Sequence, residues 1–332
     1  MRRIKIKVAI LEEIGKIVYK EDYPTPVPGP DDALVRVRYC GICGSDITHF
    51  KYKTYQIPII MGHELVGEVV ELGENISKVE VGEKVTCLNV ALDFSEGKLG
   101  GLGMFQDGGF AEFVKVPKIS LFRVPENVPI RDAVMIETFA LAMRAFKLSG
   151  IEPNQNIVIF GGGNVGLAFL KALLIEKDPN YVIVVEPLEY LRNKALELGA
   201  THAVPPGRPK IKKHIRNLGT PSYIFDCVGN EQTISDGIFL IKKGGTILIE
   251  GMYKGSVSVR IFMVNNKEVT IKGCLGHDRE DILNAIDLFV KNKIDVSEFI
   301  SEEVHLEDLQ KTFERFLDPS NRNFVKIIVN PS

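Results

Sequence analysis

Short apolar segments separated by proline and glycine make up the N-terminal part of the chain. Residues 8–11, 16–19, 33–38 and 66–72 have the length and the β-branched composition of strands. Residues 23–30 contain four prolines, which exclude both a helix and a sheet ladder there. The pattern therefore predicts an all-β body, either a barrel or a sandwich.

The pattern becomes irregular after this body and then turns helical. Residues 93–109 carry six glycines, which predict a long mobile loop, and two prolines in 125–129 mark a second break. From 131 to 148 the apolar positions follow helical spacing, and Ser149 and Gly150 supply a C-terminal stop.

Strand and helix patterns then alternate through the middle of the chain. The expected elements are strands at 156–160, 181–185, 223–228 and 245–249, and helices at 166–176 and 189–198. Because these strands are short and apolar throughout, they predict a parallel sheet that helices cover on both faces. Two helices at 278–292 and 306–317 and a strand at 324–329 complete an α/β chain.

A glycine motif marks where a dinucleotide would bind. The run G-G-G-N-V-G at residues 161–166 is a G-x-G-x-x-G turn that follows an expected strand and opens an expected helix. Its glycines let the backbone approach a pyrophosphate, which lies at the positive end of the helix.

An acidic residue supports the same interpretation. Glu186 ends the next strand, about 20 residues on, where a carboxylate binds the ribose 2′-hydroxyl. It favours NAD over NADP because a 2′-phosphate would face like charge, although Pro187 and Arg192 lie close by and weaken this preference. The residues assigned to the cofactor are Gly161, Gly163, Asn164, Val165, Gly166, Glu186, Arg192, Cys227 and Val228.

Composition and charge narrow the class of protein. The chain has 332 residues and a formal net charge of −2, so it lacks the basic footprint of a nucleic-acid-binding protein. Its apolar runs fall short of the roughly 18 residues of a membrane span, and residues 1–7 lack the apolar core of a secretion signal. Five cysteines, an odd number, do not make a disulfide framework. We expect a cytoplasmic, two-domain protein with neither a nucleic acid nor a membrane as partner.

Cys40 and Cys43 form a C-x-x-C pair that has three interpretations. A zinc ribbon needs a second such pair, and the chain has none. A thioredoxin-like redox pair is expected at the start of a helix in a βαβ unit, whereas this pair follows a strand in the all-β region. In the third interpretation Cys43 is a metal ligand together with His63, and Cys40 is a small buried residue.

A longer motif around His63 identifies a family. The run G-H-E-L-V-G at 62–67, followed by Gly73 and Ile76, matches in full the signature of zinc-containing alcohol dehydrogenases. With the run G-I-C-G-S-D at 41–46 and the dinucleotide turn, the chain resembles the zinc-dependent medium-chain dehydrogenase/reductase family. Within that family it is most similar to the polyol (sorbitol-type) and threonine dehydrogenase branch.

The resemblance implies a domain organisation. A GroES-like β-barrel catalytic domain would comprise residues 1–137 and 277–332, and a Rossmann coenzyme domain with a doubly wound parallel sheet would comprise 138–276. It also implies a homodimer or homotetramer, in which a strand at 257–260 near the edge of the coenzyme domain pairs between subunits.

The same resemblance assigns a metal site. Cys43 and His63 would be catalytic zinc ligands, and Glu64 a carboxylate that binds the metal or lies just behind it. A further ligand would come from the run M-I-E-T-F at 135–139, where Glu137 stands in place of the cysteine of alcohol dehydrogenases. Because Cys87 is the only cysteine between residues 86 and 113, we expect one catalytic zinc and no structural zinc.

The family resemblance also implies roles for polar residues that lie close to the metal ligands in the sequence. Ser45 would accept the proton of the substrate hydroxyl, and Asp46 would orient the groups around it. The branch usually places a histidine three residues after this serine, whereas His49 lies one position later. His49 is therefore left open between a proton relay and a plain surface histidine.

The implied activity is transfer of a hydride from a secondary alcohol, which would be a sugar, a polyol or a diol, to NAD. The alternatives are an amino-alcohol oxidation of the L-threonine 3-dehydrogenase type and, in a different class, a non-catalytic nucleotide-sensing protein. A zinc-free quinone or enone reductase is a third, but such enzymes lack the Cys and Gly-His-Glu ligands. The segment 301–307 is acidic where polyol relatives often carry arginine, which argues against a standard polyol pocket.

Overall fold

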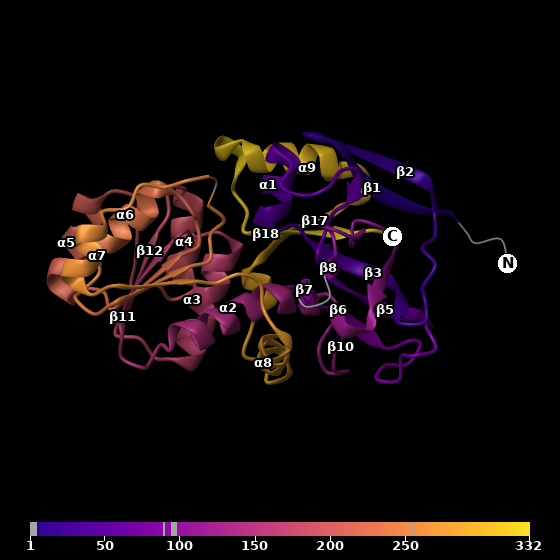
Figure 1. Cartoon of the computed structure of the whole chain (residues 1–332), viewed down its shortest axis with the longest axis horizontal. Helices are drawn as coiled ribbons and strands as arrows, with labels where there is room; N and C mark the ends of the chain where they lie inside the picture. Colours follow the sequence, from indigo (N-terminus) through magenta and orange to yellow (C-terminus); the bar gives the residue numbers. More distant parts are fainter. Residues whose placement is uncertain (1–4, 89, 94–97, 254) are drawn as a thin grey trace. The chain divides into compact units, whose positions relative to one another are not determined.

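The computed structural model describes residues 5–88, 90–93, 98–253 and 255–332. The chain divides into two compact units, one formed by Met1–Glu137 with His277–Ser332 and the other by Thr138–Gly276. Figure 1 shows both units and labels the helices and many of the strands. We describe each unit by itself.

Besides a two-stranded pair within residues 90–101, the described residues of the first unit form two sheets. The strand orders are β2-β1-β4 and β10-β6-β5-β3-β18-β17, and β9 pairs with β3. Pairing is antiparallel except between β17 and β18. The strands are β1 (Lys5–Glu13), β2 (Lys16–Pro24), β3 (Asp32–Gly41), β4 (Ile59–Ile60), β5 (Glu64–Leu72), β6 (Lys84–Cys87), β9 (Phe113–Pro117), β10 (Leu121–Arg123), β17 (Ile300–His305) and β18 (Lys326–Asn330). These bounds confirm the predicted strands of the all-β body and the last strand of the chain.

Among the described residues, three α-helices lie wholly within the first unit, namely α1 (Gly44–Tyr52), α8 (Arg279–Val290) and α9 (Leu309–Leu317). Phe313 of α9 is fully buried, and its ring centroid lies 5.3 Å from that of Phe50 on α1 and 6.0 Å from that of Phe110. This aromatic cluster anchors α9 and the end of α1 on the β body. Helix α1 was not predicted, because its short polar run lacks an apolar stripe.

The predicted mobile loop at 93–109 is wrong for the described part of that stretch. β7 (Val90–Asp93) pairs with β8 (Lys98–Gly101) as an antiparallel hairpin, and Gly97 lies outside the described residues. Further on, the backbone amides of residues 108, 109 and 110 donate to the carbonyls of residues 60, 62 and 61. A Cβ on Gly108 would lie 2.2 Å from the carbonyl oxygen of Gly62. Glycine marks a close backbone approach at this position.

The second unit contains a six-stranded parallel sheet with the order β13-β12-β11-β14-β15-β16. Numbered from β11 along the chain, this is the 3-2-1-4-5-6 order of a doubly wound dinucleotide-binding fold. The strands are β11 (Asn156–Phe160), β12 (Tyr181–Val185), β13 (His202–Val204), β14 (Tyr223–Asp226), β15 (Thr246–Ile249) and β16 (Thr270–Gly273). The predicted parallel sheet is confirmed.

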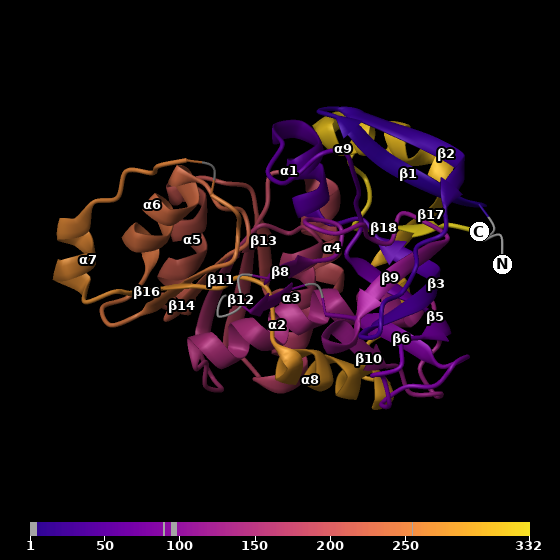
Figure 2. The same ribbon diagram turned by 45° about the vertical axis from the view of Figure 1, so that its right-hand side comes forward.

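Helices alternate with these strands. They are α2 (Ile136–Ser149), whose first two residues belong to the first unit, α3 (Asn164–Glu176), α4 (Glu189–Glu197), α5 (Arg208–Leu218), α6 (Glu231–Leu240) and α7 (Ile261–Lys267). Helices α5 and α6 lie side by side in Figure 1 and in Figure 2. The strand expected at 257–260 is absent, because those described residues have no regular structure and lead into α7. Across the described ranges, no helix is long and apolar enough to cross a membrane.

Candidate metal centre and dinucleotide turn

Two neighbouring strands bring the ligand candidates together. Gly41 at the end of β3 is the register partner of Glu64 at the start of β5, so Cys43 just beyond β3 lies next to the beginning of β5. Gly62 has φ of +90°, and a Cβ there would lie 2.7 Å from the Cys40 sulfur. Only glycine suits this combination of backbone angle and close contact.

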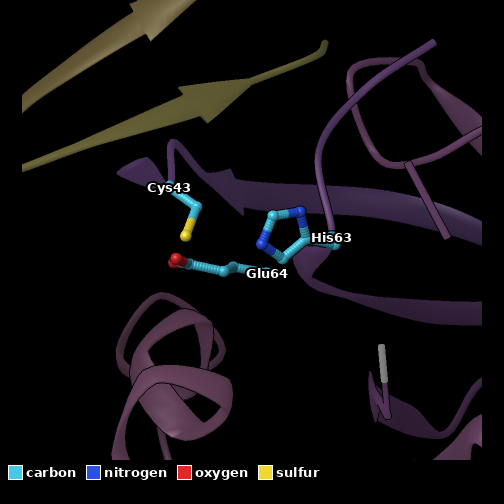
Figure 3. Close-up of side chains that lie close together, drawn as sticks. All are labelled: Cys43, His63 and Glu64. Atoms are coloured by element: carbon cyan, nitrogen blue, oxygen red, sulfur yellow. The ribbon is translucent and has the colours of Figure 1, made fainter. Parts of the chain in front are cut away.

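Cys43, His63 and Glu64 form the one three-residue cluster of metal-ligand type found in the described residues. Their ligand atoms all lie within 4.8 Å of one another, and Figure 3 shows the thiol, the imidazole and the carboxylate close together. His63 and Glu64 are 2% and 1% exposed. Zinc bonds of about 2.0–2.3 Å place ligand atoms roughly 3 to 4 Å apart. The donor set and its spacing therefore fit a zinc ion.

Asp46 and Ser45 contact the two ring nitrogens of His63. An Asp46 oxygen lies 3.4 Å from Nδ1, and the Ser45 hydroxyl lies 3.3 Å from Nε2. The other Asp46 oxygen accepts a hydrogen bond of 2.9 Å from the backbone amide of Cys43. Burial lowers the pKa of His63, but the nearby Asp46 and Cys43 outweigh this and hold it well above its ordinary value. Asp46 thus ties the cysteine backbone to the imidazole.

Glu64 is paired with a buried cation. The ammonium of Lys326 on β18 contacts the Glu64 carboxylate and donates to the Ile42 carbonyl at 3.2 Å. Lys326 is fully buried, which lowers its pKa, but Glu64 and Cys43 reverse the effect and raise it. Lys326 was not predicted from the sequence, where its one signal is a lysine inside the apolar run V-K-I-I-V.

Glu137 lies outside the three-residue cluster. It opens α2, and its Oε1 is 2.9 Å from Nε2 of His277, whose side chain is completely buried. Burial raises the pKa of Glu137, but the hydrogen bond from His277 and the charges of His277, His63 and Lys326 bring it below its ordinary value. The role of His277 as the partner of Glu137 was likewise not predicted from the sequence. Glu137 as a metal ligand stays a prediction.

His49 is buried, and both of its ring nitrogens face the backbone of the loop after α1. It is 1% exposed, its Nδ1 accepts from the Tyr55 amide at 3.0 Å, and its Nε2 lies 3.2 Å from the Gln56 carbonyl. Burial lowers its pKa. The surface position left open for His49 is therefore wrong, because the buried ring holds the loop after α1 through both of its nitrogens, and the relay role stays a prediction.

The sequence predicted that the C-x-x-C pair follows a strand and does not begin a helix. The pair does in fact lie at the start of a helix. Cys43 is the N-cap of α1. Cys40, however, is fully buried in an antiparallel sheet, its pKa is raised well above the ordinary value by burial, and both cysteines are free thiols. A buried, protonated thiol is a poor redox partner.

The glycine turn has the context that its motif requires. It joins β11 to α3, with Gly163 as the N-cap. A Cβ on Gly166 would lie 2.0 Å from the carbonyl oxygen of Gly161, so only glycine fits at this position in the first turn of α3. Asn164 donates to the Thr138 hydroxyl at 3.2 Å, and Val165 is half-buried in the first turn of α3. The close contact at Gly166 and the hydrogen bond of Asn164 therefore fix the conformation of the glycine turn.

Glu186 is fixed beside this turn. One carboxylate oxygen accepts from the Gly162 amide at 2.8 Å and the other from the Leu188 amide at 2.9 Å. Arg192 donates to the carbonyls of Glu186 and Pro187 at 2.9 and 2.6 Å. The arginine thus holds the backbone that carries the carboxylate.

Cys227 and Val228 also adjoin the turn. They follow β14, and a Cβ on Gly161 would lie 3.0 Å from a Val228 methyl and 3.6 Å from the Cys227 Cβ. Val228 is 42% exposed, and its amide donates to buried Asp226 at 3.0 Å. The residues assigned to the cofactor therefore lie together just beyond the carboxyl ends of β11, β12 and β14.

Two family models match the chain. Residues 29–126 match the alcohol dehydrogenase GroES-like domain, and residues 164–291 match the model described as zinc-binding dehydrogenase. Together they cover more than half of the chain.

Similar proteins span its whole length. D-xylulose reductase of Saccharomyces cerevisiae is 29% identical, with 97% of each chain covered. L-galactonate-5-dehydrogenase of Escherichia coli K12 is 26% identical, with 98% of each covered. Among solved structures, a candidate zinc-binding dehydrogenase from Sinorhizobium meliloti 1021, bound to NADP, has a TM-score of 0.89 and 27% identity over 99% of this chain and 100% of its own.

Proposed function

We infer, for a chain that belongs to the zinc-dependent medium-chain dehydrogenase family, oxidation of a secondary alcohol with hydride transfer to a nicotinamide dinucleotide. The observation that carries this function is the cluster of Cys43, His63 and Glu64, a buried metal-ligand set in a chain that also has a dinucleotide turn. Glu137 is proposed as a further carboxylate of the same centre.

We propose a separate role for each residue of the metal centre. Cys43, His63 and Glu64 would hold zinc, which supplies a Lewis acid that lowers the pKa of the substrate hydroxyl. Asp46 keeps the His63 ring in place through the contact at Nδ1, as carboxylates behind metal-bound histidines do. The Ser45 hydroxyl, which lies beside His63, would accept the proton that the substrate hydroxyl loses while passing its own proton on toward the ribose and solvent.

NAD is the proposed cofactor. The support is Glu186, whose carboxylate lies beside the glycine turn and would repel a 2′-phosphate. The Sinorhizobium meliloti relative carries NADP in its structure, so the preference needs a direct comparison of both nicotinamides.

We propose a polyol or sugar derivative as substrate, because the two curated relatives are named for the xylulose and galactonate reactions. The acidic segment at 301–307 does not oppose this. Glu302 forms a two-pronged ion pair with Arg315, at 2.9 and 2.8 Å, and Glu303 lies 3.7 Å from Arg131. These acidic groups are engaged with neighbouring arginines, so they need not line a substrate pocket.

A reduction screen tests the function. We expect NAD to be reduced with at least one member of a panel of polyols, aldoses, short diols and L-threonine, by protein with about one zinc per chain measured in parallel. Reduction with L-threonine alone would move the assignment to amino alcohols. Zinc-loaded protein that binds NAD yet oxidises none of the panel would favour the non-catalytic alternative.

A further inference from the structure

Two buried carboxylates near the metal-ligand cluster differ in how their oxygens are used. Glu64 is paired with the buried ammonium of Lys326. Glu137 accepts from His277 through Oε1, while its buried Oε2 has no hydrogen-bond partner in the described part of the chain. A buried polar atom without a partner indicates a group that the site is built to receive.

The position of His277 is set by its own backbone. Gly276 before it has φ of +60°, and Asp278 after it is the N-cap of α8. Asp278 accepts from the amides of the first turn of α8, and Asp281 accepts from the Asp278 amide at 2.8 Å. The imidazole therefore extends from a capped helix start, and its side chain is fully buried.

Glu137 and His277 also mark the two crossings of the chain. Glu137 is the last residue of the first unit before the second unit is inserted, and His277 is the first residue after it. Their hydrogen bond joins side chains that are 140 positions apart in the sequence. A contact of this kind fixes the start of α2 to the start of α8 inside the first unit.

We propose that His277 is a positioning residue for the metal centre. The Nε2–H group donates to Oε1 of Glu137, which stops the carboxylate from rotating and reserves Oε2 for the metal. Glu64 has a buried cation beside it, whereas Glu137 presents a buried oxygen, Oε2, that no hydrogen bond occupies among the described residues, so Glu137 can add a carboxylate ligand to the centre. The inference rests on the proposed function, because it requires a metal at Cys43 and His63. Outer-sphere hydrogen bonds of this kind are worth about 10- to 100-fold in metal affinity.

A matched pair of substitutions tests the hydrogen bond. In His277→Gln the amide nitrogen occupies the place of Nε2, whereas in His277→Asn it occupies the place of Nδ1 and does not reach Glu137. We expect zinc affinity, measured by competition with a chelator, to fall about 10- to 100-fold in His277→Asn. His277→Gln should stay within about threefold of the unmodified protein, and its Co²⁺-loaded visible spectrum should match that protein, whereas His277→Asn should differ.

A double substitution separates positioning from general damage. Glu137→Gln should weaken zinc at least as much as His277→Asn, and the double variant should bind zinc no more weakly than Glu137→Gln alone, because His277 acts through Glu137. His305→Asn, at an exposed position on β17, serves as a control that leaves zinc affinity unchanged. Thermal unfolding of the metal-free proteins reports any loss of fold.

The outcomes keep this inference apart from the proposed function. Unmodified protein that fails to bind zinc would overturn the proposed function itself. Zinc binding by the unmodified protein, with the same affinity and the same Co²⁺ spectrum in His277→Asn, would overturn only the role of His277. If the losses of zinc affinity in the two single variants multiply in the double variant, the positioning role of His277 is overturned as well.

Discussion

Three buried side chains determine what the metal-ligand cluster can do. Asp46 contacts His63, Lys326 neutralises Glu64, and His277 donates to Glu137. Each predicted ligand other than Cys43 thus has an ionisable partner within the first unit. Because a buried ionised group is costly without such a partner, these pairs explain how so many charges are accommodated.

Lys326 gives a prediction about stability. Lys326→Met leaves the Glu64 carboxylate buried without its cation, so we expect the free energy of unfolding of the metal-free protein to fall by about 3–5 kcal/mol. Adding Glu64→Gln should recover most of the loss. Denaturant unfolding measures both values, and Lys115→Met, at the exposed position of β9, should change the free energy by less than about 0.5 kcal/mol. A loss in Lys326→Met that persists in full beside Glu64→Gln would refute the pairing.

Glu186 gives a prediction about cofactor choice. A hydrogen bond to a charged group is worth about 1.5–3 kcal/mol, so Glu186→Gln should lower kcat/KM with NAD by about tenfold or more. The value with NADP should fall less or rise, because the repulsion of a 2′-phosphate is removed. Glu189→Gln, an exposed charge in the first turn of α4, is the control. Unmodified protein that prefers NADP would show that Glu186 does not select the cofactor.

At the scale of elements, the feature that stands out is the edge strand β16. All four of its residues are exposed, and Ile271 on it, Leu275 just after it and Phe262 on α7 are 38%, 73% and 78% exposed. An exposed, partly apolar edge is a template for another strand. We propose that a second copy of the chain pairs there, because a two-fold axis makes such an edge self-complementary.

The edge strand can be tested by mass in solution. We expect a dimer or a larger homo-oligomer at micromolar concentration by light scattering, and a shift toward monomer for Ile271→Lys. Ile119→Lys, a change of the same kind at an exposed position of the first unit, should leave the mass unchanged. A monomeric unmodified protein, or an Ile271→Lys protein with unchanged mass, would contradict the proposal.

Local sequence patterns predicted most elements of the molecule and the orienting role of Asp46, but not the distant partners of Glu64 and Glu137. The signature around His63 and the turn at 161–166 are contiguous in the sequence, and so they could be found by reading along the chain. Lys326 and His277 could not, because they meet Glu64 and Glu137 across 262 and 140 positions. The glycines near residue 108 were misread as flexible, because close backbone approach and mobility leave the same composition.

We propose that one zinc, bound through Cys43, is required for the activity of this chain. The most direct test measures zinc per chain and alcohol-dependent NAD reduction in Cys43→Ser beside the unmodified protein. We predict that Cys43→Ser loses both, while Cys40→Ser keeps both with a modest loss of stability, since Cys40 only packs in the core. A Cys43→Ser protein that is free of zinc and fully active would contradict the account.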